Sequence, residues 1–554
     1  TFARLTSGDI IRLDEGARAA FGLAEDLGVD AVDLLDGVSL PASSTLFVDS
    51  MLARTPALEA DRDAAFRRTV ERLDTLGKMD FTVPASLKAT MRGYQVDGYQ
   101  WLGSLEHLGL GGILADDMGL GKTLQMIAHI LARVEAGDTK PTLVVCPASL
   151  VYNWTAELER FAPSLDVCAI VGAKAQRRVQ IACVAEHNVV VTSYDLMRRD
   201  IDEYAERDFA RVVLDEAQYI KNPLTQVARA AKRLPAGVRF ALTGTPIENR
   251  LSELWSIFDF LMPGLLGTRE SFAKRFESPV EHAEGDSAAR LQALVSPFVL
   301  RRVKEDVVAD LPEKIEDTVM AQLTGEQRKL YLANQDRIAQ QVQHREAGEF
   351  KKDKLKVLAE LTKLRQICCD PHLHYADYKA GSAKLDTCME LVHGALDGGH
   401  RILLFSQFTG MLDIIGKRLA KEDIAFLKLT GASSKESRAK MVAQFQAGEV
   451  PVFLISLKAG GVGLNLTAAD VVIHYAPWWN VAAQDQATDR AHRIGQQHTV
   501  TVYKLIAKDT IEERIMQMQE SKRDLVNSVL GGDGISSALF TREDVLALLG
   551  GDGR

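Results

Sequence analysis

Short runs of β-branched and aliphatic residues alternate in this chain with stretches whose apolar residues recur at helical spacing. The runs form two series, one in each half of the chain. They cover residues 142–146, 167–171, 189–192, 211–214 and 239–242, and then residues 401–405, 426–429, 452–455, 471–475 and 500–506. Because strands that alternate with helices form parallel sheets covered on both faces, the sequence predicts an α/β protein with two such sheets in tandem.

The segments outside the two series have other patterns. Between about 250 and 370 the strand pattern disappears and helical spacing dominates, whereas residues 1–80 carry only amphipathic stretches such as 60–76. We therefore predict an N-terminal accessory or truncated region at 1–80, a first lobe at 81–265, a helical insertion at 266–372, a second lobe at 373–525 and a C-terminal tail at 526–554. Since the chain begins with Thr1 and shows no signal-peptide pattern, we expect a fragment or a processed form.

Composition narrows the class of protein. With 554 residues, of which 46% are hydrophobic and 25% charged, the chain has the make-up of an ordinary globular protein of several domains. No apolar run is long enough to cross a bilayer, so we predict no membrane segment and a cytoplasmic location. The net charge of −9 argues against a protein that coats nucleic acid through its overall charge, so a nucleic-acid site would have to be a local groove.

The six cysteines have no paired spacings, which indicates reduced thiols. One cluster, Cys368 and Cys369 with His372 and His374, contains residue types that bind metals. It lacks a second ligand pair at the spacing of zinc fingers, and we predict no zinc site there.

A glycine-rich stretch follows the apolar run 112–115 and opens the helical pattern 124–131. Such a turn between strand and helix points backbone N–H groups at one place, and the helix N-terminus adds positive potential. A lysine there can reach the β- and γ-phosphates of a nucleotide, and a neighbouring hydroxyl can bind Mg²⁺. The sequence therefore predicts a phosphate loop formed by Asp117, Met118, Gly119, Leu120, Gly121, Lys122 and Thr123, with Thr123 on the metal. Asp116 stands where the generic pattern has its first glycine, so a chance glycine-rich turn is the alternative that the surroundings must exclude.

Polar residues follow two other predicted strands of the first series. The run 211–214 is followed by Asp215 and Glu216, and the run 239–242 by the short polar segment 243–246. An acidic residue after an apolar strand is suited to holding Mg²⁺ through its water shell. We therefore assign Asp215 to the metal and Glu216 to the attacking water.

Two further features suit a nucleotide. The helical pattern at 91–102 carries Gln95 near its start, and a carboxamide can donate and accept together, as the edge of adenine requires. Arg490 and Arg493 lie three residues apart, on one face if the segment is helical. A guanidinium is planar and permanently charged, so it suits a γ-phosphoryl group whose charge redistributes during transfer. We predict an adenine contact at Gln95 and arginine fingers at Arg490 and Arg493.

The order of these motifs, from about Leu87 to Arg523, resembles that of helicase superfamily two. The residues within each motif resemble those of its Swi/Snf branch, the ATP-dependent translocases on double-stranded DNA. Besides the motifs above, the resemblance rests on 144–147 with Trp154, 192–194, 242–249, 298–304, 311–314, 364–368, 405–408, 458–465, 477–480 and 489–496. It implies two RecA-like lobes in tandem, with family-specific helical insertions between them and an N-terminal accessory region.

The resemblance also implies roles that spacing alone does not assign. The residues in motifs that line the DNA backbone groove of relatives are Thr192, Ser193, Ser406, Gln407 and Lys458. The residue implied to contact ATP from the second lobe is Gln486. Those implied to couple hydrolysis to movement are Gln218, Thr243 and Thr245. Three positions depart from the family's pattern: Gln218 replaces a frequent His, Ala476 an acidic residue and Val481 a proline.

Some features keep two interpretations. The basic clusters 301–304 and 351–354 are either solvated helix faces or part of a nucleic-acid site. The pair Trp478 and Trp479 either stacks on bases or packs in a core.

From the resemblance we expect a DNA-stimulated ATPase that uses ATP and Mg²⁺, moves along double-stranded DNA and displaces or remodels complexes bound there. Its partners would be duplex DNA and RNA polymerase or other DNA-bound proteins, and we expect a monomer associated with the nucleoid. Two alternatives stay open: a helicase that separates strands, and an ATP-gated scaffold on RNA polymerase or another DNA-bound complex.

Overall fold

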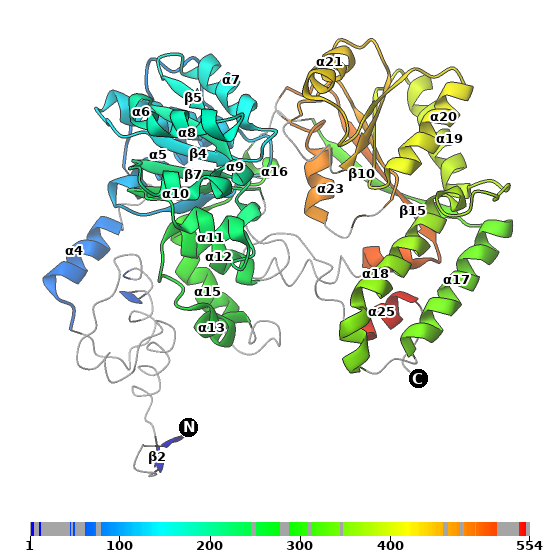
Figure 1. Ribbon diagram of the computed structural model, residues 1–554, viewed down its shortest axis with the longest axis horizontal. Helices are drawn as coiled ribbons and strands as arrows, with labels where there is room; N and C mark the ends of the chain where they lie inside the picture. The colour runs from blue at the N-terminus through cyan, green and yellow to red at the C-terminus, as the bar shows by residue number, and fades with distance from the viewer. Residues whose placement is uncertain are drawn as a thin grey trace. The chain divides into compact units, whose positions relative to one another are not determined.

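The computed structural model of the chain describes most residues between 61 and 517. The described ranges are 2–4, 10–12, 45, 48–49, 52, 61–73, 79–244, 251–277, 287–307, 312–343, 347–457, 464–476, 478, 481–493, 495–517 and 542–549. The chain forms two compact units that divide between Val307 and Val308. We call them lobe 1 and lobe 2; each contains one large parallel sheet (Figure 1).

Lobe 1 contains a seven-stranded sheet whose strand pairs are all parallel. The spatial order is β5-β6-β4-β7-β8-β3-β9. The strands are β3 (Gly112–Leu114), β4 (Thr142–Cys146), β5 (Val167–Ala169), β6 (Val189–Ser193), β7 (Arg211–Asp215), β8 (Val238–Leu242) and β9 (Val299–Leu300). Every residue of β4 and β6 is buried, as expected for strands of a parallel sheet that is covered on both faces. The parallel α/β lobe predicted for the first series is confirmed.

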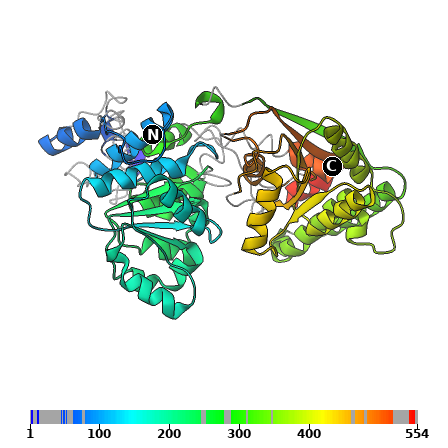
Figure 2. The same cartoon turned by 90° about the horizontal axis from the view of Figure 1, so that it is seen from above.

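Helices connect these strands and surround the sheet (Figure 2). The α-helices are α5 (Gly93–His107), α6 (Lys122–Glu135), α7 (Val151–Phe161), α8 (Lys174–Ala182), α9 (Tyr194–Arg199), α10 (Ile201–Tyr204), α11 (Gln226–Lys232), α12 (Leu251–Leu261), α13 (Arg269–Phe272), α15 (Ser287–Val295) and α16 (Lys304–Val307). Shorter turns of 3₁₀ helix include η3 (Ala217–Ile220) and η5 (Ser296–Phe298), and residues Ala273–Glu277 form a π-helical turn.

A buried cluster of charged side chains ties the start of β7 to two helices. Arg211 is fully buried, and its Nε donates to Glu106 Oε2 on α5 at 2.7 Å. The same carboxylate oxygen lies 2.6 Å from His129 Nε2 on α6. Burial opposes the charge on Glu106, but the hydrogen bonds from His129 and Arg211 outweigh it and lower the pKa of Glu106 to about 2. The cluster fixes β7, whose other end carries Asp215, against α5 and α6.

Lobe 2 contains a six-stranded, all-parallel sheet in the order β10-β15-β14-β11-β13-β12. Its strands are β10 (Lys314–Gln322), β11 (Ile402–Ser406), β12 (Phe426–Leu429), β13 (Val452–Ser456), β14 (Val471–His474) and β15 (Val500–Lys508). Its α-helices include α17 (Gly325–Gln343), α18 (Ala347–Cys369), α19 (Ala383–Asp397), α20 (Thr409–Lys421), α21 (Lys435–Gln446), α23 (Val481–Thr488) and α25 (Arg542–Leu549). The second predicted lobe is therefore confirmed as well.

The prediction that residues 250–370 lack strands is wrong at two places. β9 extends the sheet of lobe 1 beside β3, and β10 pairs along its whole length with β15. β9 has two residues, too few to show a pattern. β10 is an edge strand whose residues are mostly exposed, so it lacks the apolar run by which the buried strands were found. The helical part of this segment is present in α12, α15, α17 and α18, while the exact domain bounds stay a prediction.

A second core in lobe 2 holds the long helices together. Tyr331 of α17 and Leu361 of α18 pack in one buried cluster with Ile511 and Ile515, which lie on a helix at 511–517. Leu548 of α25 belongs to the same cluster.

Little of the N-terminal region is described. The elements described there include a short antiparallel pair, β1 (Phe2–Arg4) with β2 (Ile10–Arg12), and the helix α4 (Ala64–Leu73). This helix falls inside the amphipathic stretch 60–76. In the parts of the chain that the structure describes, no helix is both long and apolar enough to span a membrane.

A buried ion pair in lobe 2 gives a testable consequence of this packing. Lys384 of α19 and Glu512 are both fully buried and form an ion pair, and Glu512 Oε2 also accepts from the backbone N–H of Ala507 at 2.9 Å. Lys384→Met would leave the Glu512 charge buried without its partner, so we expect a loss of about 3–5 kcal/mol in the unfolding free energy of lobe 2. Urea unfolding measures it.

The double variant Lys384→Met with Glu512→Gln is the control. It removes both charges and keeps a side-chain acceptor for Ala507, so we expect it to recover most of the lost stability. A single variant as stable as the parent chain would contradict the assignment.

Candidate functional site

The glycine-rich stretch forms a loop between β3 and α6, as predicted. Gly119 and Gly121 have φ angles of +86° and +81°, in the left-handed region that favours glycine. Gly121 is the residue immediately before α6, which begins at Lys122. The first N–H groups of α6, which have no partners within the helix, therefore face the loop. The strand-loop-helix geometry excludes the alternative of a chance turn, whereas phosphate binding by Asp117–Thr123 stays a prediction.

The side chain of Lys122, the first residue of α6, reaches back to the start of this loop. Its ammonium donates to the backbone oxygen of Asp116, and it lies 3.3 Å from the backbone oxygen of Asp117. The segment after β8 also reaches this point, because a Cβ added to Gly244 would lie 3.9 Å from Lys122 Nζ. Parallel pairing of β7 with β8 and of β8 with β3 brings the three strand ends to one edge of the sheet.

Asp215 lies at the carboxyl end of β7, on this edge. The indole N–H of Trp154 donates to Asp215 Oδ2 at 2.8 Å, and the hydroxyl of Tyr194 donates to the backbone oxygen of Asp215, also at 2.8 Å. Burial, together with the neighbouring Glu216 carboxylate, raises the pKa of Asp215 to about 7, although Trp154 and the Lys122 ammonium act in the opposite direction.

These donors fit a magnesium ion. The Glu216 carboxylate is one cause of the raised pKa of Asp215, and a divalent cation would relieve that repulsion. Mg²⁺ is usually held by one or two carboxylates, with water and phosphate oxygens completing its shell. Within the described ranges, no group of three or more His, Cys, Asp or Glu residues could hold a metal by itself. Asp215 and Thr123, which lies in the first turn of α6, would hold the ion.

Glu216 is held in an unusual backbone conformation. Its φ of +53° and ψ of 55° lie in the left-handed region, which costs a residue with a side chain about 1 kcal/mol or more. Such strain is often found at functional sites, where surrounding contacts maintain it. The carboxamide of Gln218 donates to Glu216 Oε2 at 2.8 Å, and the hydroxyl of Thr243 donates to Gln218 Oε1 at 3.0 Å.

These two hydrogen bonds form a chain from the end of β7 to the end of β8. The structure thus brings Glu216, Gln218 and Thr243 together, and the amide of Gln218 links the other two. Thr245 lies outside the described residues. The coupling role of the chain stays a prediction.

Gln95 is buried against the phosphate loop. Its amide Nε2 donates to the backbone oxygen of Leu120 at 3.1 Å, and its Oε1 accepts from the backbone N–H of Arg92 at 3.0 Å. The hydroxyl of Tyr94 donates to the same oxygen of Leu120. Gln95 therefore fixes the loop to the start of α5, and its contact with adenine stays a prediction.

Three residues that sequence reasoning did not assign to the site stand out. Trp154 and Tyr194 hold Asp215, as described above. Arg302, which follows β9, forms a salt bridge with the fully buried Asp116 of the loop. The basic cluster 301–304 is therefore not a solvated helix face at Arg302. The signal for this in the sequence was that Arg302 lies in 298–304, one of the segments on which the family resemblance rests.

The residues predicted in lobe 2 have different surroundings. Gln486 lies on α23, but α23 ends at Thr488, so Arg490 and Arg493 follow it in turns. The condition under which both arginines would share a helix face, a helical segment, is therefore not met. Arg490 is buried within lobe 2, and its backbone oxygen accepts from the N–H of Leu466. Their roles as arginine fingers stay predictions.

The residues predicted to contact DNA are mostly buried at strand ends. The hydroxyl of Thr192 donates to the backbone oxygen of Ile170 at 3.3 Å, and Ser193 caps the start of α9. Ser406 bonds with the backbone of Phe408. Gln407 accepts a hydrogen bond from the buried Arg365 at 3.1 Å. In this conformation, the hydroxyls of Thr192 and Ser406 support the loops rather than present themselves to a ligand. Lys458 lies outside the described residues, and all five DNA contacts stay predictions.

Two other features are now settled in part. Cys368 and Cys369 are buried, and burial raises the pKa of Cys369 to about 12, so these thiols are structural. Trp478 packs against a core cluster of lobe 2, while Trp479 and the side chains of 351–354 lie outside the described residues.

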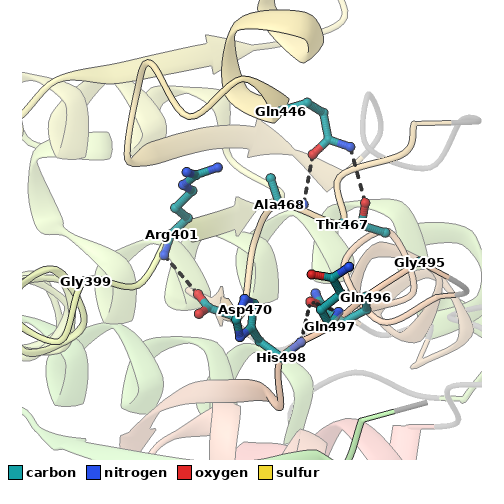
Figure 3. A pocket seen from close by; sticks show the side chains of 10 residues that line it. All are labelled: Gly399, Arg401, Gln446, Thr467, Ala468, Asp470, Gly495, Gln496, Gln497 and His498. Carbon is teal, nitrogen blue, oxygen red and sulfur yellow. Dashed lines mark hydrogen bonds between the residues drawn. The ribbon is translucent and has the colours of Figure 1, made fainter. Parts of the chain in front are cut away.

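A pocket of about 430 Å³ opens on lobe 2 (Figure 3), and none of its lining residues has a predicted site role, although Gly495 and Gln496 belong to the segment 489–496. Arg401, Asp470 and His498 line it, and they precede β11, β14 and β15, so it lies at the amino ends of these strands. Several of its polar side chains bind one another or the backbone, as Gln446 does with Thr467 and Ala468. It occupies the edge opposite the strand ends that carry the predicted motifs.

Known protein families match both lobes. Residues 94–373 match the SNF2-related domain, and residues 383–495 match the helicase conserved C-terminal domain. The chain is 39% identical over 461 residues to an uncharacterised ATP-dependent helicase of Mycoplasma pneumoniae, which covers 83% of this chain and 44% of that protein. It is 39% identical over 537 residues to the putative ATP-dependent helicase/translocase YwqA of Bacillus subtilis, covering 94% and 58%.

More distant relatives include the TATA-binding protein-associated factor MOT1 of Saccharomyces cerevisiae, at 34% identity over 545 residues, covering 85% of this chain and 29% of that protein. Among solved structures, the SWI2/SNF2 ATPase core of Sulfolobus solfataricus in complex with double-stranded DNA is 38% identical, covers 82% of this chain and 95% of that chain, and has a TM-score of 0.43. The chain spans roughly half the length, or less, of the curated relatives named above.

The chain of hydrogen bonds from Glu216 to Thr243 can be tested by a double-mutant cycle. Gln218→Ala removes the donor to Glu216, and Thr243→Val removes the bond that orients Gln218. We expect Gln218→Ala to lower kcat for nucleotide hydrolysis about tenfold, equivalent to about 1.4 kcal/mol. Because Thr243 acts through Gln218, the double variant should be no slower than Gln218→Ala alone. Steady-state hydrolysis by the four proteins measures this, and additive effects would separate the two residues.

Proposed function

Because the chain belongs to the SNF2-related, or Swi/Snf, family of helicase superfamily two ATPases, we propose that it hydrolyses ATP to move along double-stranded DNA and to displace or remodel protein complexes bound there. One observation supports the proposal above all others. One edge of the lobe 1 sheet carries the phosphate loop, the adjacent carboxylates of Asp215 and Glu216, and the chain of hydrogen bonds from Glu216 to Thr243. Phosphoryl transfer requires such an arrangement.

We assign each site residue of lobe 1 a separate role in ATP hydrolysis. The loop N–H groups and Lys122 bind the phosphates, and Gln95 holds the loop in shape. Asp215 and Thr123 would hold Mg²⁺, which would supply positive charge to neutralise the phosphates. Glu216 accepts a proton from the attacking water or orients it, while Gln218 fixes the direction of the carboxylate. Arg490, Arg493 and Gln486 complete the proposed set from lobe 2.

The choice of DNA as the track rests on the relatives. The Bacillus subtilis relative is named a helicase/translocase, and the name of the yeast relative links it to a TATA-binding protein. These names fit an enzyme whose clients are bound to DNA, and RNA polymerase complexes belong to that class. A translocase contacts phosphates and sugars rather than bases, because it must pass every sequence. We propose that it works as a monomer in the cytoplasm, on nucleoid DNA.

Glu216→Gln separates binding from chemistry. The substitution keeps the size of the side chain and removes the proton acceptor, so we expect ATP affinity within about threefold of the parent chain and a fall in kcat of about 10²-fold or more. A fluorescent ATP analogue measures affinity, and phosphate release measures kcat. Glu159→Gln, on the exposed side of α7, is the matched control and should behave as the parent chain does. Near-normal turnover in Glu216→Gln would remove this residue from the chemistry.

Movement along DNA is tested by triplex displacement. We expect duplex DNA to stimulate hydrolysis, and ATP to drive release of a third strand annealed to the duplex, because a translocase clears whatever lies ahead of it. Glu216→Gln serves as the control without turnover. Hydrolysis without displacement would favour an ATP-gated scaffold on a DNA-bound complex. Efficient unwinding of a plain forked duplex would favour a strand-separating helicase.

A further inference from the structure

The first residues of the phosphate loop are bonded to the segment with which lobe 1 ends. β3 pairs with β9, with Leu114 opposite Leu300. The pairing continues beyond the strands: the N–H of Ala115 donates to the oxygen of Leu300 at 2.7 Å, and the N–H of Asp117 donates to the oxygen of Arg302 at 3.0 Å. The loop therefore starts as an extension of a parallel strand pair.

The guanidinium of Arg302 joins three elements around the loop. Its Nε donates to Asp116 Oδ1 at 2.8 Å, and a second nitrogen donates both to Asp116 Oδ2 and, at 2.8 Å, to Gln125 Oε1 of α6. The remaining nitrogen donates to the backbone oxygen of Tyr94 on α5, and the guanidinium lies 5.2 Å from the centre of the Tyr94 ring.

Asp116 depends on this arrangement. The residue is fully buried, and its second oxygen also accepts from the amide of Gln125 at 3.1 Å. These hydrogen bonds fix the conformation of the buried Asp116 side chain. They thereby also restrict the backbone at position 116. Where the generic phosphate loop relies on the freedom of glycine at this place, this chain holds the loop through an ion pair.

Gly98 of α5 leaves the space that the side chains of Arg302 and Gln125 occupy. A Cβ added to Gly98 of α5 would lie 1.9 Å from Gln125 Oε1 and 2.7 Å from a guanidinium nitrogen of Arg302. Glycine inside a helix costs about 0.5–1 kcal/mol relative to alanine. The contact explains why the helix carries it.

We infer that Arg302 is a positioning residue for the nucleotide: acting through Asp116 and the backbone of 115–117, it sets the shape in which the phosphate loop binds phosphate. The inference rests on the nucleotide binding proposed above. A buried ion pair is by itself weak support for stability, because a pair of apolar residues often does as well. What favours positioning is that the contacts of Arg302 converge on the loop and on the two helices beside it.

The same segment is also the covalent connection to the rest of the chain. After Arg302 the chain forms α16, in which the N–H of Lys304 donates to Asp117 Oδ2 at 3.2 Å, and it passes into lobe 2 at residue 308. The last segment of lobe 1 before the connection to lobe 2 is therefore also the segment that holds the phosphate loop.

Arg302→Gln tests the inference against a matched pair in the same lobe. Arg177 and Asp200 form an equally buried two-pronged pair, with distances of 2.6 Å and 2.9 Å, and Arg177 also donates to a backbone oxygen, that of Gly172. Arg177→Gln therefore removes a forked ion pair and a bond to a backbone oxygen at a place away from the loop, although Arg302 has in addition its contacts with Gln125 and the Tyr94 ring. We expect Arg302→Gln to raise the Kd for ADP and the KM for ATP about tenfold or more, with kcat at saturating ATP changed less than about threefold.

The control defines what a purely structural role would look like. Arg177→Gln should lower the melting temperature to a similar extent and leave Kd and KM within about twofold, since loss of folded protein lowers apparent kcat but not KM. Arg302→Lys keeps the charge but loses the fork, and we expect an intermediate KM. If Arg302→Gln does not fold, Gly98→Ala tests the network with the guanidinium in place and should raise KM in the same direction. Unchanged KM in Arg302→Lys and Gly98→Ala, or equal KM in Arg302→Gln and Arg177→Gln, would overturn the inference.

Hydrogen exchange without nucleotide separates this inference from the proposed function. We expect the amides of 115–121 to exchange faster in Arg302→Gln than in the parent chain, and at the parental rate in Arg177→Gln. If the parent chain binds no ATP or ADP, the proposed function fails, and the exchange rates still show whether Arg302 shapes the loop. Equal exchange in all three proteins would overturn the inference whatever the nucleotide binding.

Discussion

Parallel pairing of three strands is the constraint on which the proposed site depends. Because β7, β8 and β3 run in the same direction side by side, the ends of all three lie on one edge of the sheet. Each end carries a different polar element: the carboxylates follow β7, Thr243 follows β8, and the phosphate loop follows β3. The β-pleat fixes their separation more firmly than loops could. Chemistry that needs a metal, a water and a phosphate in line can therefore be assembled from short polar segments.

The parts of this arrangement that could be predicted are those coded locally. An apolar run that ends in Asp215 and Glu216, or in a glycine-rich turn, shows both the strand and the polar residue in one short window. Both lobes, the phosphate loop and the helix that follows it were predictable for this reason. β9 and β10 were not, because a two-residue strand has no period and an exposed edge strand does not need an apolar run.

Contacts between distant residues were also beyond the sequence. Arg302 and Asp116 lie 186 positions apart, and each looks ordinary alone, one as part of a basic cluster and the other as a defect in a motif. Burial of the Thr192 hydroxyl has the same origin, since a hydroxyl near the end of a strand can face solvent or bond to a neighbouring segment of the sheet, as Thr192 does with Ile170. Only the neighbours along the sheet decide between these possibilities, and they come from other parts of the chain.

The substitution of glycine by Asp116 changes how the phosphate loop can form. A glycine provides backbone freedom from the start, whereas a buried carboxylate is costly until its partner arrives. Here the partner follows β9, the last strand of lobe 1 in sequence. The loop can therefore reach its final shape only after β9 has paired with β3 and brought Arg302 to Asp116. The chain passes into lobe 2 only a few residues after Arg302, so the connection between the lobes begins beside the network that holds the loop.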